Sequence, residues 1–199
     1  MQGVIIAGIG TDVGKTVAAA VVAKALGADY WKPVQTGPDF SADRLELERL
    51  VPGIHIHPET HHYPDPMSPH AAAANAGTAI GLGDFVIPKA ERLVVELAGG
   101  LEVPLNDRHT NMDLIKQLGL PVILVSRYYL GSINHTMLSL AQLKHAGISC
   151  KGLIFNGDVV PSTREAILAH SEVPVLLDLP HLDDLSADLV AFHAQSLHL

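Results

Sequence analysis

A glycine-rich loop near the N-terminus contains residue types that can hold a phosphate. The stretch GIGTDVGKT (residues 8–16) follows the apolar run GVIIA and precedes the helical pattern VAAAVVAKAL. Its spacing departs from the usual phosphate loop, in which a glycine stands five residues before the glycine of Gly-Lys-Thr, because that position is Ile9 with a glycine on either side. Backbone N–H groups of the loop and the helix N-terminus can still cradle a phosphate. Lys15 would add positive charge on the outer phosphates, and the Thr16 hydroxyl can ligate magnesium, so we predict a nucleotide-binding loop.

Further polar residues stand where apolar runs end or a helix begins. Lys32 follows the apolar end of one run and would face the same crevice as Lys15, although a solvated charge at a strand end is the alternative. Asp43 opens a helical pattern, where it could act only as a favourable N-terminal charge, but its carboxylate also suits Mg²⁺. Glu96 ends the run RLVVE, and an acidic residue at such a strand end often serves the metal in phosphate-loop proteins.

The elements that must position these side chains are short apolar runs alternating with helical patterns. Nearly continuous hydrophobic runs are typical of strands buried on both faces of a parallel sheet, and the alternation predicts a doubly wound α/β fold, with ligands bound beyond the carboxyl ends of the strands. The segment 51–85 is rich in Pro, His and Gly and lacks a strong period, apart from one short helix. The expected strands are Gly3–Ala7, Asp29–Val34, Arg92–Leu97, Pro121–Ser126, Lys151–Asn156 and Val173–Asp178; the expected helices are Thr16–Leu26, Asp43–Leu50, Pro69–Ala76, Met112–Leu118, Ser132–Ala146, Thr163–His170 and Ala187–Ser196.

Size and composition predict a single cytoplasmic domain spanning residues 1–199. A formal net charge of −8 without a basic stripe argues against a nucleic-acid partner, and no apolar stretch reaches the length of a membrane span. The N-terminus lacks the basic and apolar regions of a signal peptide. Cys150 is the lone cysteine, which fits a reducing compartment and is more typical of a small buried hydrophobe than of a nucleophile.

Six motifs in order carry a resemblance to a known family. They are GIGTDVGKT, WKPVQTG, DPMSPHAAA, VELAGGLEVPL, LGSINHTMLSL and IFNGDV, and they run from Gly8 to about Val159. Together they resemble dethiobiotin synthetase, the penultimate enzyme of biotin synthesis, whose loop follows a Gly-x-x-Thr-(Asp/Glu)-Val-Gly-Lys-Thr pattern. The resemblance accounts for the displaced glycine and implies the single-domain fold of the phosphate-loop (P-loop) NTPases, with a mostly parallel sheet flanked by helices.

The resemblance also implies a reaction and a set of site residues. The family is an ATP-dependent cyclo-ligase that converts 7,8-diaminononanoate and carbon dioxide to dethiobiotin, through a carbamate and a mixed carbamic–phosphoric anhydride. It implies Mg²⁺ as the cofactor, with ATP as co-substrate, and a homodimer with the substrate at the interface. Carried onto this sequence, the catalytic residues are Lys15 and Lys32; the metal ligands are Thr16, Asp43 and Glu96; the nucleotide-binding residues are Asp12, Val13, Gly14, Lys15, Thr16, Val17, Asp43, Glu96, Gly99, Asn156, Gly157, Pro180, His181 and Leu182; and the substrate residues are Thr36, Gly131, Ser132 and Asn134.

Two positions depart from the family pattern. Leu97 replaces the first glycine of the family's Glu-Gly-Ala-Gly-Gly, so we expect crowding of the nucleotide or an altered turn beside Glu96. Asp178 stands where the family often has a glycine before Pro180, which weakens that part of the match. On the sequence alone, Asn134 is equally well read as a first-turn helix cap.

Alternative functions are less favoured by the sequence. A switch ATPase of the kind that positions division or partition machinery carries a lysine early in the loop, where this chain has Gly10, and often ends in a basic helix, whereas the tail SADLVAFHAQSLHL has no Lys or Arg. A glutamine-dependent amide synthetase would need an added amidotransferase domain. The stretch HIHPETHH could be read as a zinc cluster of His55, His57, His61 and His62, but it lacks cysteine partners, and histidine-rich tracts support only compositional assignments.

Overall fold

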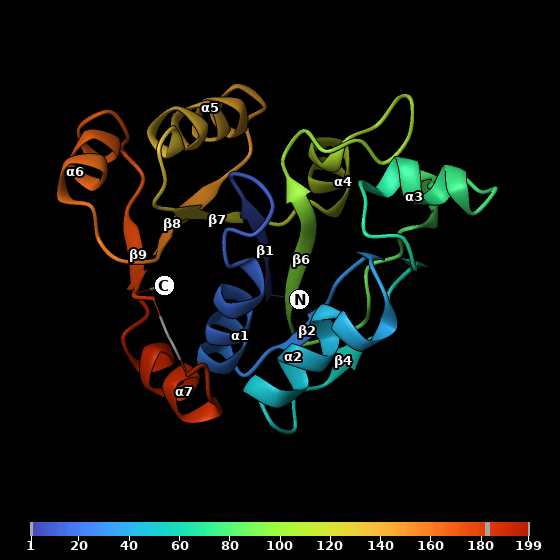
Figure 1. The fold of residues 1–199 in the computed structure, drawn as a ribbon, viewed down its shortest axis with the longest axis horizontal. Coiled ribbons are helices and arrows are strands. Elements are labelled where there is room, and N and C mark those ends of the chain that lie inside the picture. The colour runs from blue at the N-terminus through green and yellow to red at the C-terminus, as the bar shows by residue number, and fades with distance from the viewer. Residues whose placement is uncertain (1, 182–183, 199) are drawn as a thin grey trace.

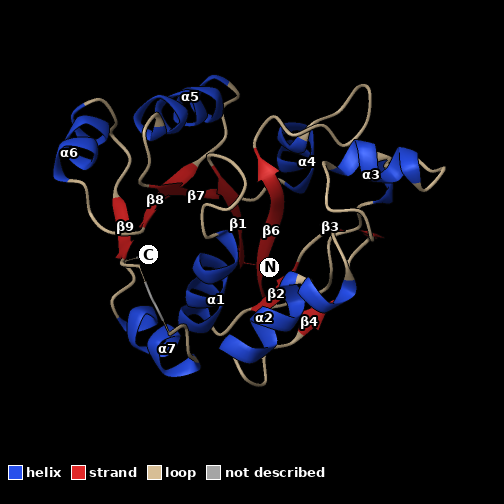
Figure 2. Ribbon diagram, in the orientation of Figure 1, coloured by secondary structure: helices blue, strands red, loops and turns tan. Residues whose placement is uncertain are grey.

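The computed structural model describes residues 2–181 and 184–198, which form a parallel β-sheet with helices on both faces (Figures 1 and 2). The seven-stranded sheet has the order β4-β2-β6-β1-β7-β8-β9, and every pair in it is parallel. Its strands are β1 (Gln2–Gly8), β2 (Asp29–Trp31), β4 (Ile56–His57), β6 (Arg92–Gly100), β7 (Val122–Arg127), β8 (Cys150–Asn156) and β9 (Val175–Leu179). The predicted doubly wound α/β class is confirmed.

Two separate hydrophobic cores lie on the two faces of the sheet. On one face, buried side chains of α1 (Lys15–Leu26), α2 (Asp43–Leu50) and α7 (Ala187–Gln195) pack on alternate residues of the central strands. On the other face, α4 (Asn111–Leu118), α5 (Ser132–His145) and α6 (Pro161–Ala169) do the same, and α3 (Pro69–Asn75) joins that core through Ala72 and Ala73. Because successive strand side chains point to opposite faces, Ile5 belongs to one core and Ile6 to the other. None of the described helices combines the length and apolar character needed to cross a membrane.

The segment expected as one strand from Asp29 to Val34 is instead two strands in different sheets, so that expectation is wrong. β2 ends at Trp31, and β3 (Val34–Thr36) pairs in parallel with β5 (His61–Tyr63) in a two-stranded sheet. Between them lie Lys32 and Pro33. Proline has no N–H to donate to a ladder, and the Pro33 carbonyl accepts hydrogen bonds from Thr60 and His61 N–H instead.

Two further strands, β4 and β5, lie in the segment for which only a short helix is expected. They are two and three residues long, so their alternation is too short to give a periodic signal. The helix in that segment, α3, is present as expected, and it is followed by a 3₁₀ turn at Leu82–Asp84. Another 3₁₀ turn, Asp39–Ser41, leads into α2.

β6 is longer than expected, and this changes the position of one candidate site residue. The strand continues from Arg92 to Gly100, so Glu96 lies within it rather than at its end. Glu96 pairs in register with Ile6, just before the phosphate loop leaves β1 at Gly8. The central strand β1 therefore delivers the loop directly beside an acidic side chain from its neighbour.

Candidate active site

The glycines of the loop are required at specific positions, and these explain its unusual spacing. A Cβ at Gly8 would lie 2.6 Å from Val13 Cγ2 and 2.9 Å from the Gly10 carbonyl oxygen, whereas a Cβ at Gly10 would meet no atom within 4 Å. Gly14 has φ 88°, and a Cβ there would lie 2.2 Å from Asn156 Nδ2. Gly8 and Gly14 are thus the glycines that this loop geometry demands, one residue further apart than in the usual motif.

The loop presents N–H groups and a lysine toward a common space. Gly14 is the N-cap of α1 with no side-chain cap, and the hydrogen bond from Ala18 N–H to the Gly14 carbonyl begins the helical ladder. The N–H groups of the helix's first residues therefore have no acceptor within the helix, and they carry the positive end of its dipole. Lys15 Nζ donates to the Gly10 carbonyl oxygen at 2.8 Å, so the ammonium folds back across the loop where it could meet an anion.

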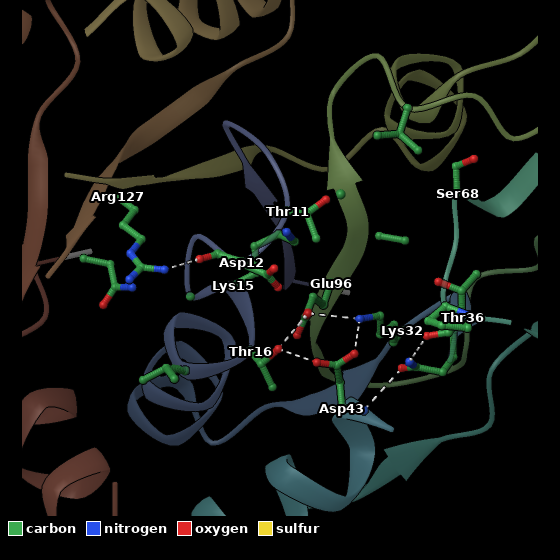
Figure 3. Close-up of a pocket in the computed structure, with 18 of the residues that line it drawn as sticks. Thr11, Asp12, Lys15, Thr16, Lys32, Thr36, Asp43, Ser68, Glu96 and Arg127 are labelled. Carbon is green, nitrogen blue, oxygen red and sulfur yellow. Dashed lines mark hydrogen bonds and ion pairs between the residues drawn. The ribbon is translucent and has the colours of Figure 1, made fainter. Parts of the chain in front are cut away.

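Four charged or hydroxyl side chains meet beside the start of α1 (Figure 3). Thr16 Oγ1 lies 2.6 Å from Asp43 Oδ1 and 3.1 Å from Glu96 Oε1. Lys32 Nζ donates to Asp43 Oδ2 and lies 3.3 Å from Glu96 Oε1. Residues that are far apart in the sequence, on α1, α2, β6 and the link after β2, thus converge at one point, and the three predicted metal-site residues lie together.

Each of these side chains is positioned by its local backbone. Pro33 ends the β2 ladder, which leaves Lys32 between the two sheets with only 7% of its surface exposed. Asp43 starts α2, and its backbone N–H is held by Gln35 Oε1 at 3.3 Å, so the carboxylate turns toward Thr16 and Lys32. Glu96 is 1% exposed, and Tyr30, which is fully buried on β2, donates its hydroxyl to Glu96 Oε2 at 2.9 Å.

The pKa values reflect this mixture of burial and opposite charge. Burial acts to lower the pKa of Lys32, but Glu96 and Asp43 outweigh it and hold that pKa above the usual lysine value. Burial likewise acts to raise the pKa of Asp43, yet the Lys32 ammonium brings it below the usual aspartate value. Lys15 has less compensation, and burial lowers its pKa. Burial and the nearby Glu96 raise the pKa of Tyr30 well above the usual value, so Tyr30 remains a hydrogen-bond donor.

The donor set is chemically suited to a hard cation. The Thr16 hydroxyl has one proton, yet two carboxylate oxygens lie within hydrogen-bonding distance of it. One hydroxyl oxygen and two carboxylates, with room for further oxygen ligands, form the kind of set that Mg²⁺ binds through a few protein groups plus phosphates and water. In this structure the positive charge beside the Asp43 and Glu96 carboxylates is the Lys32 ammonium.

A cavity of about 890 Å³ opens over this cluster and the phosphate loop. It is large enough for a nucleotide and a second small molecule by comparison with ordinary ligand pockets of about 300–1,000 Å³. Most of the residues predicted from the sequence line it: Asp12, Gly14, Lys15, Thr16, Val17, Lys32, Thr36, Asp43, Glu96, Gly99, Asn156, Pro180 and His181.

Other predicted residues lie elsewhere. Val13 is 2% exposed and packs in the core beneath the loop. Gly157, the α5 N-cap Gly131 and the α5 residues Ser132 and Asn134 are not among the described residues that line the cavity. Leu182 lies outside the described residues.

The N-terminus of α5 has the form expected for an anion site, although it stands apart from the cavity. Gly131 takes the N-cap position with φ 102° and no side-chain cap, so Asn134 is not the N-cap residue. Ser132 is buried, and its Oγ accepts from Tyr129 N–H at 3.5 Å, whereas Asn134 is exposed.

The expected crowding by Leu97 does not occur. Neighbouring strand residues point to opposite faces, so Glu96 and Ala98 face the cavity while Leu97 is 1% exposed in the core on the other side of the sheet. Asp178 is the other position at which this chain departs from the family pattern. Its carboxylate lies 3.1 Å from Arg164 Nη2.

Three residues that contribute to the site were not predicted from the sequence. Tyr30 reads as an ordinary aromatic core residue, and Gln35 stands in a strand too short to be recognised. Arg127, at the end of β7, donates from Nη1 to the Asp12 carbonyl oxygen at 2.9 Å and so supports the loop (Figure 3). On the opposite flank, Asn156 Nδ2 donates to the Val13 carbonyl at 3.0 Å. A polar residue at a carboxyl strand end was the available signal for Arg127.

This chain is similar to known proteins over most of its length. A family model described as an AAA domain matches residues 2–188. The ATP-dependent dethiobiotin synthetase BioD of Paramagnetospirillum magneticum is 41% identical over 192 residues, covering 96% of this chain and 94% of that protein. The protein of the same name from Christiangramia forsetii is 46% identical over 186 residues, covering 90% and 89%.

Solved structures with a similar fold come from other families. A ParA family ATPase from Chlorobium tepidum covers 100% of this chain and 99% of its own, with a TM-score of 0.61 at 14% identity. The septum site-determining protein MinD of Pyrococcus horikoshii, complexed with Mg-ADP, gives a TM-score of 0.58 at 17% identity, covering 98% of this chain and 93% of its own. At these identities the likeness establishes the fold, whereas the relatives at about 40% identity establish the family. This chain belongs to the ATP-dependent dethiobiotin synthetase family.

Proposed function

We propose that the protein catalyses ATP-dependent carboxylation and ring closure of 7,8-diaminononanoate, yielding dethiobiotin, ADP and phosphate. The observation that carries the proposal is the second buried lysine. Lys32 stands with Asp43, Glu96 and Thr16 immediately beside the phosphate loop and its own Lys15. Two ammonium groups in one cavity can neutralise an attacking oxyanion and a transferring phosphoryl group together, which a loop that only binds nucleotide does not need.

The reaction follows from bringing three substrates into this cavity. One amine of the diamine adds to carbon dioxide and loses a proton, giving a carbamate. A carbamate oxygen attacks the γ-phosphorus of ATP, the bond to the bridging oxygen breaks, and ADP leaves. The second amine then attacks the carbonyl carbon of the mixed anhydride and loses a proton, and phosphate departs as the ring closes. Positioning and charge neutralisation are the protein's tasks, so no nucleophilic side chain is required.

Within this scheme the side chains have distinct roles. Lys15 and the loop N–H groups would hold the β- and γ-phosphates. Lys32 would bridge the carbamate and the γ-phosphate, where its charge matters most as negative charge develops on the transferring group. Thr36, which ends β3 and lines the cavity, would offer its hydroxyl to the diamine.

Thr16, Asp43 and Glu96 would hold Mg²⁺ together with phosphate oxygens. When bound, Mg²⁺ neutralises phosphate charge and fixes the γ-phosphate for in-line attack. Lys32, which pairs with both carboxylates here, would then contact carbamate and phosphate oxygens instead. Mn²⁺ can replace Mg²⁺ as a paramagnetic probe: its electron paramagnetic resonance spectrum with ATP should change in Asp43→Asn, and an unchanged spectrum and Mn²⁺ affinity would remove Asp43 from the metal site.

We further propose a homodimer in which the partner subunit completes the diamine site. The α5 N-terminus, with Gly131, Ser132 and Asn134, is suited to the substrate carboxylate but lies apart from the described cavity lining of its own chain. Apolar side chains around it, Tyr129, Leu130 and Ile133, are exposed, and Leu130 is fully so. Burying this patch on a twofold mate would bring an α5 N-terminus toward the neighbouring cavity and exclude water from the labile anhydride.

We also infer that one domain carries the whole activity and that it works in the cytoplasm. The free Cys150 thiol supports a reducing compartment. Carbamate chemistry at the phosphate loop distinguishes this proposal from a switch ATPase, whose extra lysine would stand at Gly10.

Product analysis tests the proposed activity. The protein is incubated with Mg-ATP, the diamine and ¹³C-bicarbonate, and the products are separated for mass spectrometry. Dethiobiotin carrying one ¹³C atom should form only in the complete mixture. Vigorous ATP hydrolysis without diamine, or ADP without dethiobiotin in the complete mixture, would refute the proposal.

A further inference from the structure

The histidine-rich segment places two imidazoles beside a carboxylate, away from the nucleotide cavity. One possible ligand atom from each of Asp29, His55 and His57 lies within 4.8 Å of the others. His57 Nε2 lies 2.9 Å from Asp29 Oδ2. The rings of His55 and His57 meet edge to face, with centroids 4.6 Å apart.

The backbone explains why these three side chains meet. β4 pairs in parallel with β2, with Tyr30 opposite Ile56 and Trp31 opposite His57. The hydrogen bond from Tyr30 N–H to the His55 carbonyl, 2.9 Å, extends that pairing and sets Asp29 beside His55. His55 directly precedes β4, which is one of the two edge strands of the sheet, and because side chains alternate along extended backbone, His55 and His57 project to the same side.

The two remaining histidines of the segment are engaged elsewhere. His61 Nε2 lies 3.1 Å from Asp84 Oδ2, and His62 Nδ1 lies 3.3 Å from Asp39 Oδ1. The reading of HIHPETHH as one four-histidine cluster is therefore wrong, and the group that does converge takes its third member from β2, which the sequence pattern could not reveal.

We propose that Asp29, His55 and His57 form a binding site for a zinc ion. Two imidazole nitrogens and one carboxylate oxygen are a common protein ligand set for Zn²⁺, with water in the fourth position. Zinc bonds of about 2.0–2.1 Å in a tetrahedron place ligand atoms about 3.3 Å apart. The His57–Asp29 pair is already near that separation, and the exposed His55 ring can rotate to close the third side.

The site is separate from the proposed chemistry and would act on the edge of the sheet. None of its three residues lines the nucleotide cavity. Partial burial of His57 and Asp29, whose side chains are 13% and 31% exposed, reduces competition from water while leaving an open position. Zinc there would link the two-residue strand β4 to β2, which leads directly into Lys32. We therefore expect bound zinc to stabilise the folded chain.

Zinc binding to tag-free protein in excess Mg²⁺ tests the site. Equilibrium dialysis should find one tight Zn²⁺ per chain, and nitrogen-15 NMR of the imidazoles should show that His55 and His57 respond first. Zinc should also raise the thermal unfolding midpoint. His55→Ala removes an exposed ligand without disturbing the fold, and His145→Ala on α5 is the matched control because His145 is also exposed.

Variants of the proposed ligands and the control variant should differ in zinc binding and in zinc-induced stabilisation. His55→Ala and Asp29→Asn should each weaken zinc binding by at least about tenfold, since even residues that only support a metal ligand commonly contribute that much. Both should lose the zinc-induced rise in unfolding midpoint, whereas His145→Ala should retain it. Zinc affinity in His55→Ala equal to that of the wild type, or imidazole shifts confined to other histidines, would overturn the proposal.

Discussion

Replacing Lys32 with glutamine should separate turnover from nucleotide binding. The side chain is 7% exposed and is the cation between Asp43 and Glu96. Glutamine keeps much of the volume and a hydrogen-bond donor but removes the charge. Lys15 and the loop N–H groups remain to bind ATP, so the Kd for Mg-ATP should change by less than about tenfold, because uniform binding interactions are retained.

The expected losses follow from the environment of Lys32. Removing one electrostatic group that acts on the developing charge costs about 100- to 1,000-fold in kcat, roughly 3–4 kcal/mol. Removing one partner of a buried ion pair costs about 3–5 kcal/mol of stability, and the lower end applies here because the Asp43 side chain is 25% exposed. The loss in kcat and the loss in stability both come from removing the Lys32 charge, but the first concerns the transition state and the second concerns the folded state.

Three measurements distinguish these effects. Kcat comes from ADP release with saturating substrates, the Kd from fluorescent-nucleotide competition, and stability from urea unfolding. Lys24→Gln, which removes an exposed lysine on α1, should change none of them. In Lys32→Gln/Asp43→Asn one of the two carboxylates that Lys32 balanced is gone and Glu96 remains, so stability should partly return while turnover stays low. Recovery of turnover together with stability, or a loss of ATP affinity equal to the loss of kcat, would refute the catalytic role.

Further predictions concern Tyr30, Asp43 and the proposed subunit contact. Tyr30→Phe leaves Glu96 Oε2 without its 2.9 Å donor and should cost about 1–3 kcal/mol of stability and raise the Mg²⁺ concentration needed for half-maximal activity, whereas Tyr63→Phe, in the small sheet, should leave the Mg²⁺ dependence unchanged. As pH falls below 3.8 the unfolded chain takes up a proton before folded Asp43 does, because the pKa of Asp43 is lowered in the fold, so this stabilisation is lost as pH falls through the folded value. Urea unfolding should therefore show a shallower acid slope in Asp43→Asn than in the exposed control Asp107→Asn, and equal slopes would contradict the ion pair. Leu130→Glu should convert dimers to monomers in light scattering and raise the KM for the diamine, whereas Phe192→Glu, exposed on α7, should not; a fully active wild-type monomer would refute the interface.

The central sheet and the loop could be predicted from the sequence because their signals are strong and local. Continuous apolar runs such as GVIIA are buried on both faces, and Gly14 followed by Lys15 stands at a helix start. The grouping of Thr16, Asp43 and Glu96 was implied by the family resemblance, and in the structure these residues come together from α1, α2 and β6. Even the displaced glycine has a local cause, since Val13 approaches Gly8 closely.

Features set by contacts between distant residues could not be predicted. The break between β2 and β3 depends on Pro33 accepting from a second strand rather than continuing the first ladder. Tyr30 stands in an apolar run and is typical of a core residue. Only the pairing of β2 with β6 brings its hydroxyl to Glu96. A family pattern gives the identity of Leu97 but not the direction of its side chain, which strand alternation turns into the opposite core. The position of α5 relative to the cavity likewise could not be predicted without the three-dimensional structure.

Oxygen tracing tests most directly the claim that a carbamate at Lys32 attacks the γ-phosphate. Diamine, Mg-ATP and freshly dissolved C¹⁸O₂ are mixed with the protein in ordinary water, and the phosphate released in the first turnovers is analysed by mass spectrometry. Ring closure expels phosphate that carries the former carbamate oxygen, so each dethiobiotin should be accompanied by one phosphate with one ¹⁸O, after correction for exchange of carbon dioxide with water. Unlabelled phosphate formed with ADP from the same mixture would show that water attacks ATP, and it would contradict the proposed mechanism.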